Sequence, residues 1–208
     1  MKNPIILAVA SVLLASCTHN DSHQLEPGPA LSSASPKRAA LVGSLKKLGK
    51  AFKEKNATGV EAFFRFPLAD STIDLYVDDS SFEKEREYSG GTVSRQMFHR
   101  FFSQIWNDMQ LEQLGFLFQH IDPSRLTATN HITYRDIRPG QPCYAFYEIS
   151  LLGDEVTLTF GTNTNENYQA QGKDGGEEQS GDECEFASVW YMKFDGQHLY
   201  FVRQASAG

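Results

Sequence analysis

The sequence predicts a single α+β domain, in which N-terminal helices pack on a mainly antiparallel sheet built from the C-terminal half. Two observations support this prediction. Apolar residues recur with helical spacing up to about residue 120, and after Asp122-Pro123 the pattern changes to short alternating runs separated by turn residues. Helices followed by hairpins in this order are typical of α+β domains.

The first helix is expected to begin near Pro36. Its apolar residues repeat along one helix face: Leu41, Leu45, Leu48 and Phe52. Gly43 and Gly49 each weaken this helix by about 1 kcal/mol relative to alanine.

The next stretch is less regular. Phe66-Pro67-Leu68 turns the chain into an extended piece at residues 71–77, and the charged segment 78–91 indicates a loop or an exposed edge. Ser94 begins the strongest helix of the sequence. Its apolar face consists of Phe98, Phe101, Phe102, Ile105 and Met109.

The C-terminal half predicts five strands, at residues 125–137, 143–152, 155–162, 185–194 and 198–204. Gly153-Asp154 and Asp195-Gly196 mark hairpin turns, since both pairs tolerate the backbone angles that tight turns need. Residues 163–183 are rich in Gly, Asn, Gln and Glu and are too long for a tight hairpin.

Two local patterns accompany this element order: Phe-Arg-Phe-Pro-Leu at residues 64–68, and an aromatic final hairpin that runs from Trp190 to Phe201. Together they resemble nuclear transport factor 2-like proteins over about residues 38–204. The resemblance implies a strongly curved, cone-like sheet with a cavity inside it. It also implies that a homodimer through the open sheet face is possible.

The N-terminus carries a targeting signal. Lys2 precedes an apolar run from Ile5 to Ala15. This run is too short to cross a bilayer core, because a helix needs about 20 residues to do so. Leu14-Ala15-Ser16-Cys17 resembles the lipobox of bacterial lipoproteins, in which the cysteine is acylated and the preceding peptide is removed. The alternative is an ordinary cleaved signal in which Cys17 falls at this place by chance.

The resemblance to lipoproteins implies a division of the chain into three parts. Residues 1–16 are the signal peptide, residues 17–36 the lipidated cysteine with a flexible tether, and residues 37–206 the folded domain. Thr18 after the cysteine favours the outer membrane, with the protein facing the periplasm.

Charge is unevenly distributed along the chain. The formal net charge of −7 becomes −8 once Lys2 is removed, and this acidity argues against nucleic acid as a partner. Residues 37–55 carry seven basic residues, and residues 163–185 carry seven acidic ones. One interpretation is that both segments are solvated surfaces. The other is that the basic segment rests on anionic lipid near the tether, while the acidic segment meets a cationic partner.

Cys143 and Cys184 form an even pair in an oxidising compartment, which favours a disulfide over two free buried thiols. A disulfide between them would close a loop of about 41 residues, which stabilises the fold by about 4 kcal/mol on the chain-entropy model. If one strand lies between the two cysteines, they stand about 10 Å apart, which exceeds the distance of about 7 Å that a bridge can span. Either the strand ends curl together or the strand order is not a simple meander.

The candidate pocket residues are His99, His131, Arg135, Tyr147 and Trp190. His99 lies just beyond an apolar helix stripe, His131 and Arg135 share one face of a strand, and the two aromatic residues could line the same cavity. A histidine of this kind is more often a surface or a satisfied core residue than a catalytic one. No catalytic set, cofactor motif or metal-ligand spacing is present in the sequence, so we expect neither cofactor nor metal.

These observations favour a non-catalytic, membrane-anchored binding module over an enzyme. The first hypothesis is recognition of a protein, as an inhibitor, an immunity-type protein or an accessory subunit of an envelope complex. The candidate contact residues are Asp174, Glu177, Glu178, Asp182 and Glu183. The alternative is a pocket for a small hydrophobic ligand, binding or enzymatic, inside the domain, and the third hypothesis is a structural role.

Overall fold

The helix that opens the domain, α1 (Pro36–Lys53), follows the sequence prediction closely. The computed structural model describes residues 35–69, 72–73, 75–166 and 184–207. Ser35 caps α1 by accepting a hydrogen bond from the backbone N–H of Arg38, and Pro36 suits the first turn, where no N–H is needed. Helix α1 therefore begins where the apolar periodicity begins.

Arg38 joins α1 to the start of the sheet. Its side chain is almost fully buried, and its guanidinium donates to the carbonyls of Leu126 and Thr129 and, over 2.7 Å, to Oδ1 of Asn130. Burial lowers the pKa of Arg38 from its usual value. This side chain fixes the short 3-10 helix η1 (Pro123–Thr127) and the turn before the first strand against α1.

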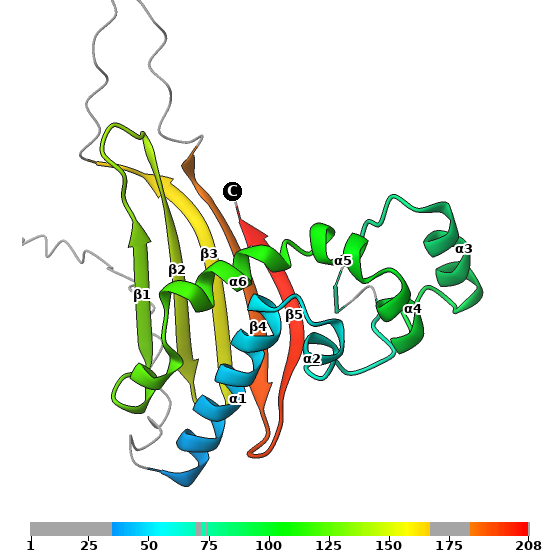
Figure 1. The fold of residues 1–208 in the computed structure, drawn as a ribbon, viewed down its shortest axis with the longest axis horizontal. Helices are drawn as coiled ribbons and strands as arrows, with labels where there is room; N and C mark the ends of the chain where they lie inside the picture. Colours follow the sequence, from blue (N-terminus) through cyan, green and yellow to red (C-terminus); the bar gives the residue numbers. More distant parts are fainter. Residues whose placement is uncertain (1–34, 70–71, 74, 167–183, 208) are drawn as a thin grey trace, which may run out of the picture.

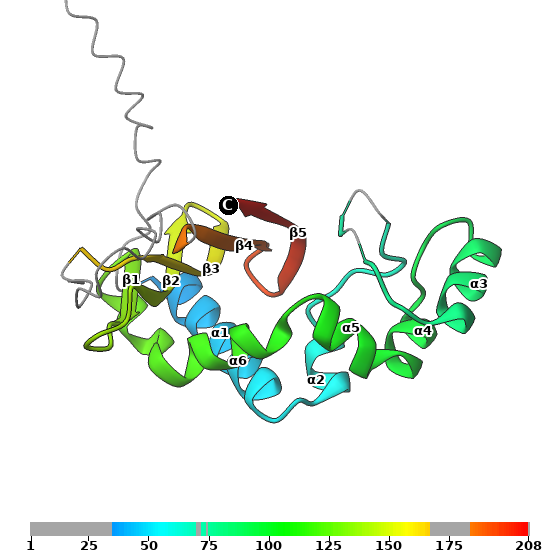
Figure 2. The same cartoon turned by 90° about the horizontal axis from the view of Figure 1, so that it is seen from above.

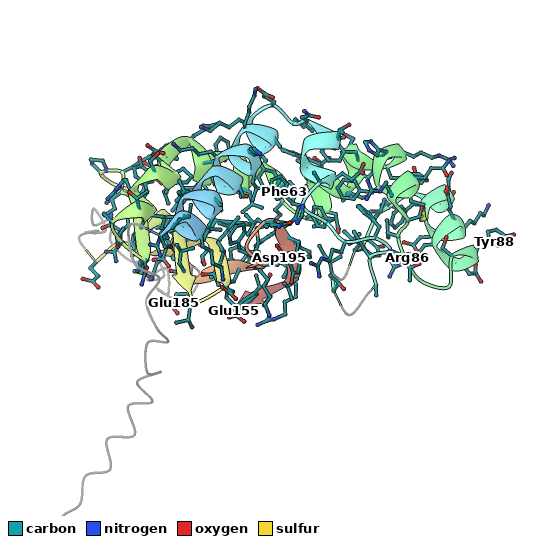
Figure 3. All side chains as sticks on the ribbon, turned by 90° about the horizontal axis from the view of Figure 1, so that it is seen from below. Phe63, Arg86, Tyr88, Glu155, Glu185 and Asp195 are labelled. Carbon is teal, nitrogen blue, oxygen red and sulfur yellow. A yellow bond between two sulfur atoms is a disulfide. The ribbon has the colours of Figure 1, made fainter. Side chains whose placement is uncertain are left out.

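The part of the chain between α1 and residue 110 forms a lobe of short helices. It contains α2 (Ala57–Glu61), α3 (Ser80–Tyr88), α4 (Arg95–Arg100) and α5 (Phe102–Asp108). Figure 1 shows α3 and α4 standing beyond β5 rather than over the sheet. Figure 3 shows Tyr88 at the outer end of this lobe, where it is 92 % exposed, and Arg86 further in.

The structure corrects two expectations in this region. Residues 80–88 form a helix and not a loop or an edge, because Asp79 accepts hydrogen bonds from the N–H groups of Ser81 and Phe82 and so caps α3. The expected long helix from Ser94 is divided into α4 and α5 at Phe101. The extended piece expected at 71–77 has no strand pairing at its described residues.

Helix α6 (Leu111–His120) follows Gln110, whose positive φ of 52° turns the chain after α5. Helices α1 and α6 pack side by side across one face of the sheet (Figures 1 and 2). Gly49 of α1 allows this close packing, since a side chain there would meet the ring of Phe118 at 2.8 Å. Within the described ranges, no helix is both long and apolar enough to span a membrane.

The sheet is an antiparallel meander in the order β1-β2-β3-β4-β5. Its strands are β1 (His131–Asp136), β2 (Cys143–Leu152), β3 (Glu155–Thr164), β4 (Phe186–Phe194) and β5 (Leu199–Ala207). The described residues thus form one α+β domain with an open sheet, and this part of the fold prediction is confirmed. The cone-like curvature stays a prediction.

The strand boundaries agree with the sequence analysis to within three residues, except at the start of the first strand. The expected strand at 125–137 begins only at His131, because Asp122 caps η1 through the N–H of Ser124 and the chain stays helical to Thr127. The core lies between the helices and one sheet face, where Ile149, Leu158 and Trp190 are fully buried.

The predicted disulfide between Cys143 and Cys184 is present, with the two Cα atoms 5.5 Å apart. The strand order is nevertheless a simple meander, with β3 between β2 and β4. Cys184 precedes β4, and its carbonyl accepts a hydrogen bond of 2.6 Å from the Thr162 hydroxyl of β3. The chain therefore crosses the end of β3 before it enters β4, which brings the two cysteines within bonding distance.

The two glycines of α1 should respond in opposite ways to substitution. Gly43→Ala adds a methyl group with nothing within 4 Å and should stabilise the protein by about 0.5–1 kcal/mol through helix propensity. Gly49→Ala should destabilise it by about 1–3 kcal/mol, because Phe118 must move. Urea unfolding of both variants tests this; equal stability would contradict the packing described for α1 and α6.

Candidate functional site

A cleft of about 560 Å³ opens between α6 and the end of the sheet formed by β1, β2 and β3. Its apolar wall is formed by Phe116, Ala145, Tyr147, Phe160 and Phe186. Phe116 projects from α6, and the others come from helix-facing positions of β2, β3 and β4. The cleft exists because α6 crosses the sheet near the middle of these strands and leaves their ends uncovered (Figure 1).

Two polar groups meet within the cleft. The hydroxyl of Tyr147 donates a long hydrogen bond of 3.5 Å to Oε1 of Gln113 on α6. Burial raises the pKa of the Tyr147 phenol above its ordinary value, and the nearby Asp136 carboxylate adds to this effect. Tyr147 therefore stays neutral at physiological pH and presents a hydroxyl that can donate and accept.

A charged pair lies at the rim of the cleft. Nη2 of Arg138 lies 2.8 Å from Oδ2 of Asp136, and this hydrogen bond holds the pKa of the carboxyl below its usual range. The same contact raises the pKa of Arg138. The cleft can thus offer a carboxylate, a guanidinium, amide groups and aromatic faces to a ligand.

The disulfide side of the cleft also holds both ends of the acidic segment. The N–H of Asn165 donates to the carbonyl of Pro142 over 2.7 Å, and Cys184 is bonded to Cys143, which lines the cleft. The candidate contact residues Asp174, Glu177, Glu178, Asp182 and Glu183 themselves lie outside the described residues, as does Cys17.

The structure does not bring the five predicted pocket residues together. Of these, only Tyr147 lines the cleft. Trp190 is 1 % exposed and packs in the core against Phe64 and Phe201. Its indole N–H has no hydrogen-bond partner among the described residues.

His131 and Arg135 lie on the opposite face of the sheet. They pair in register with Ser150 and Phe146, whereas Tyr134 between them pairs with Tyr147 on the helix-covered face. His131 Nε2 lies 3.7 Å from Oε1 of Glu148, and Arg135 stacks over the ring of Tyr144. The prediction that the two share one face of a strand is correct, but that face does not border the cleft.

His99 belongs to a separate cluster in the helical lobe. It lies on α4, where its Nε2 contacts Oε2 of Glu61, and Nη1 of Arg95 reaches Oε1 of the same carboxylate over 2.6 Å. The Glu61 side chain is 6 % exposed, whereas the side chains of Arg95 and His99 are 66 % and 41 % exposed. The cluster joins α2 to α4 and lies apart from the cleft residues.

Comparison of the chain with protein-family models, with curated proteins and with solved structures found no match.

The sequence analysis missed the polar residues of the cleft and the role of Glu61. Gln113 and Phe116 are three residues apart on one helix, a spacing that places both on one face and could have indicated a shared site. Asp136 and Arg138 follow directly from a strand end, where functional side chains often gather. Within the described part of the chain, no group of His, Cys, Asp and Glu residues is arranged to hold a metal ion.

The Glu61 cluster should stabilise the lobe. Glu61→Gln removes a buried carboxylate that Arg95 and His99 both contact, and we expect a loss of about 1–2 kcal/mol in unfolding free energy, reduced by the exposure of Arg95. Glu54→Gln is the matched control, because Glu54 lies 3.8 Å from Lys50 on the surface and should change stability by less than about 0.5 kcal/mol. If chemical denaturation gives equal losses of unfolding free energy for the two variants, the Glu61 cluster contributes no more to stability than a surface ion pair.

Proposed function

We propose that the protein is a lipid-anchored binding module of the bacterial cell envelope, with a nuclear-transport-factor-2-like domain whose ligand site is the cleft between α6 and the sheet. The observation that carries the proposal is the lining of this cleft, in which aromatic walls surround a small number of polar groups. A volume of about 560 Å³ suits a small organic molecule, since ligand sites generally measure about 300–1,000 Å³.

The expected ligand has an apolar or aromatic part and a polar end. The apolar part would lie between Phe116, Phe160 and Phe186, and the polar end would meet Gln113 and Tyr147 or the Asp136–Arg138 pair. We propose binding rather than catalysis, because the Asp136 carboxylate is occupied by Arg138 and the Tyr147 hydroxyl stays protonated.

The cell-envelope assignment is supported by the sequence and by the disulfide. Leu14-Ala15-Ser16-Cys17 ends an apolar run, as a lipobox does, and a disulfide that closes a loop of 41 residues is typical of an oxidising compartment. The outer membrane, with the domain facing the periplasm, is the proposed location.

Protein recognition through the acidic segment is the second proposal. It is favoured by the positions of Asn165 and Cys184, which hold both ends of the segment beside residues 141–143 at the cleft rim. A partner that contacts the acids would therefore also lie close to the cleft.

Filling the cleft should weaken ligand binding. Ala145→Phe places a ring among the lining residues, and we expect the affinity for the fluorescent probe 8-anilinonaphthalene-1-sulfonate to fall at least about tenfold, a free-energy change of about 1.4 kcal/mol. Ala187→Phe is the matched control, because Ala187 lies on the opposite sheet face. Thermal unfolding of both variants checks that each is folded; equal probe binding by the two would contradict the proposal.

The anchor is tested at Cys17. Cys17→Ser removes the thiol that would be acylated, so the protein should move from the membrane fraction to the soluble periplasmic fraction. A chain that remains with the membrane through detergent-free washing at high salt would contradict lipid anchoring at this residue, because salt screens the remaining charge attractions.

A further inference from the structure

The outer surface of the helix layer carries a second groove, of about 520 Å³, between α1 and the end of α6. Three lysines of α1 lie along it: Lys46, Lys50 and Lys53. Their spacing of four and three residues places them on one side of α1, the side that borders α6. All three are exposed, so their ammonium groups are available to a partner.

The opposite wall of this lysine groove comes mainly from α6. It includes Phe118, Gln119 and His120 from the last turn of α6. The His120 ring stacks on Tyr134 with centroids 4.3 Å apart and planes 3° from parallel. The groove is therefore formed mainly by the packed helices α1 and α6, and the short link at residues 121–122 completes it.

The groove also contains two carboxylates. Oε1 of Glu54 lies 3.8 Å from Nζ of Lys50. The pKa of Asp122 is lowered chiefly by the backbone N–H of Ser124, and the charges of Lys46 and Lys53 contribute. Three lysines therefore outnumber two carboxylates in the groove, although the chain as a whole is acidic.

We propose that the lysine groove binds the phosphate groups of anionic phospholipids in the membrane that carries the lipid anchor. The inference rests on the proposed function for the anchor alone and not for the cleft. Ammonium groups attract phosphate oxygens at an anionic membrane surface, and each lysine near that surface contributes separately to affinity.

The length of the chain before the domain permits this contact. Eighteen residues, Thr18 to Ser35, separate Cys17 from the start of α1, and such a chain can reach at most about 60 Å. Lys46 and Lys53 lie about 15–26 Å along α1 from Pro36, given the helical rise of 1.5 Å per residue. The anchor can therefore be inserted while the lysine groove rests on the headgroups.

This contact would also orient the domain. Helices α1 and α6 cover one face of the sheet, as Figure 2 shows from above, so a membrane against the helices leaves the opposite sheet face directed away from it. That open face carries His131, Arg135 and Tyr191, and it would be accessible to a partner or a second copy.

Vesicle binding by the mature chain without its lipid, residues 18–208 with no acylated cysteine, tests the proposal directly. The probe is vesicles of equal amounts of phosphatidylethanolamine and phosphatidylglycerol, with phosphatidylcholine vesicles as the neutral reference. We expect binding to the anionic vesicles only. Changing Lys46, Lys50 and Lys53 to Glu should reduce the affinity by about a hundredfold or more, because each lysine is worth about fivefold.

The matched control changes the same total charge elsewhere, with Lys84→Glu, Arg135→Glu and Lys193→Glu, and should keep most of the affinity. Circular dichroism and thermal unfolding confirm that both triple variants are folded. Equal losses in the two variants, or no preference of the unaltered chain for anionic vesicles, would overturn the lysine groove as a lipid site. Because this assay involves neither acylation nor the cleft, its failure is distinct from failure of the probe-binding or Cys17 experiments.

Discussion

A continuous chain of aromatic contacts joins the sheet to the helical lobe and to α1 and α6, and the arrangement of these helices depends on it. It runs from Trp190 and Phe201 in the sheet through Phe64, Phe98, Phe102 and Trp106 to Phe52 and Phe118. Neighbouring ring centroids along it lie 4.8–6.2 Å apart, within the range in which aromatic pairs attract. Because α3 and α4 stand beyond β5, these rings supply the burial that the sheet itself cannot offer them (Figure 1). Phe63 lies at the same junction, between lobe and sheet (Figure 3).

The two grooves of the molecule follow from how α6 is placed. Its buried face contacts the core through Leu114 and Leu117, and its two ends remain beside open space. At the N-terminal end, Gln113 and Phe116 face the uncovered ends of β1 to β3; at the C-terminal end, His120 faces the lysines of α1. One short helix thus separates an aromatic cleft from a basic groove, which allows ligand binding and membrane contact at different places.

Periodicity predicted the parts of the fold in which burial alternates regularly. Helix α1 and strands β2 to β4 were predicted to within about two residues, since their apolar patterns repeat at the spacing of one helix or sheet face. The break at Phe101 was not predictable in this way, because Phe98, Phe101 and Phe102 are all buried and satisfy a helical stripe on either side of the break. The capping role of Asp79 was visible in principle, but the charged residues around it concealed the helix.

The site was less predictable because it depends on contacts between distant segments. Tyr147 lines the cleft, whereas Trp190 shares its sheet face but lies under the lobe. The spacing of His131 and Arg135 established that they share a face, but the register that decides which face comes only from the pairing with β2. Likewise, nothing in the local sequence links His99 to Glu61, which lies 38 positions earlier on another helix.

The crossing of β3 by the chain before Cys184 has a consequence for how this protein can change over time. Because the disulfide and the Thr162 hydrogen bond set the point where the chain enters β4, the sheet register does not depend on the length of the preceding segment. Insertions, deletions and sequence drift between residues 166 and 183 can therefore accumulate without disturbing the hydrophobic core. Asn165 and Cys184 fix the two ends of that segment beside the cleft, so the preference for the proposed partner can diverge among descendants while the scaffold is inherited intact.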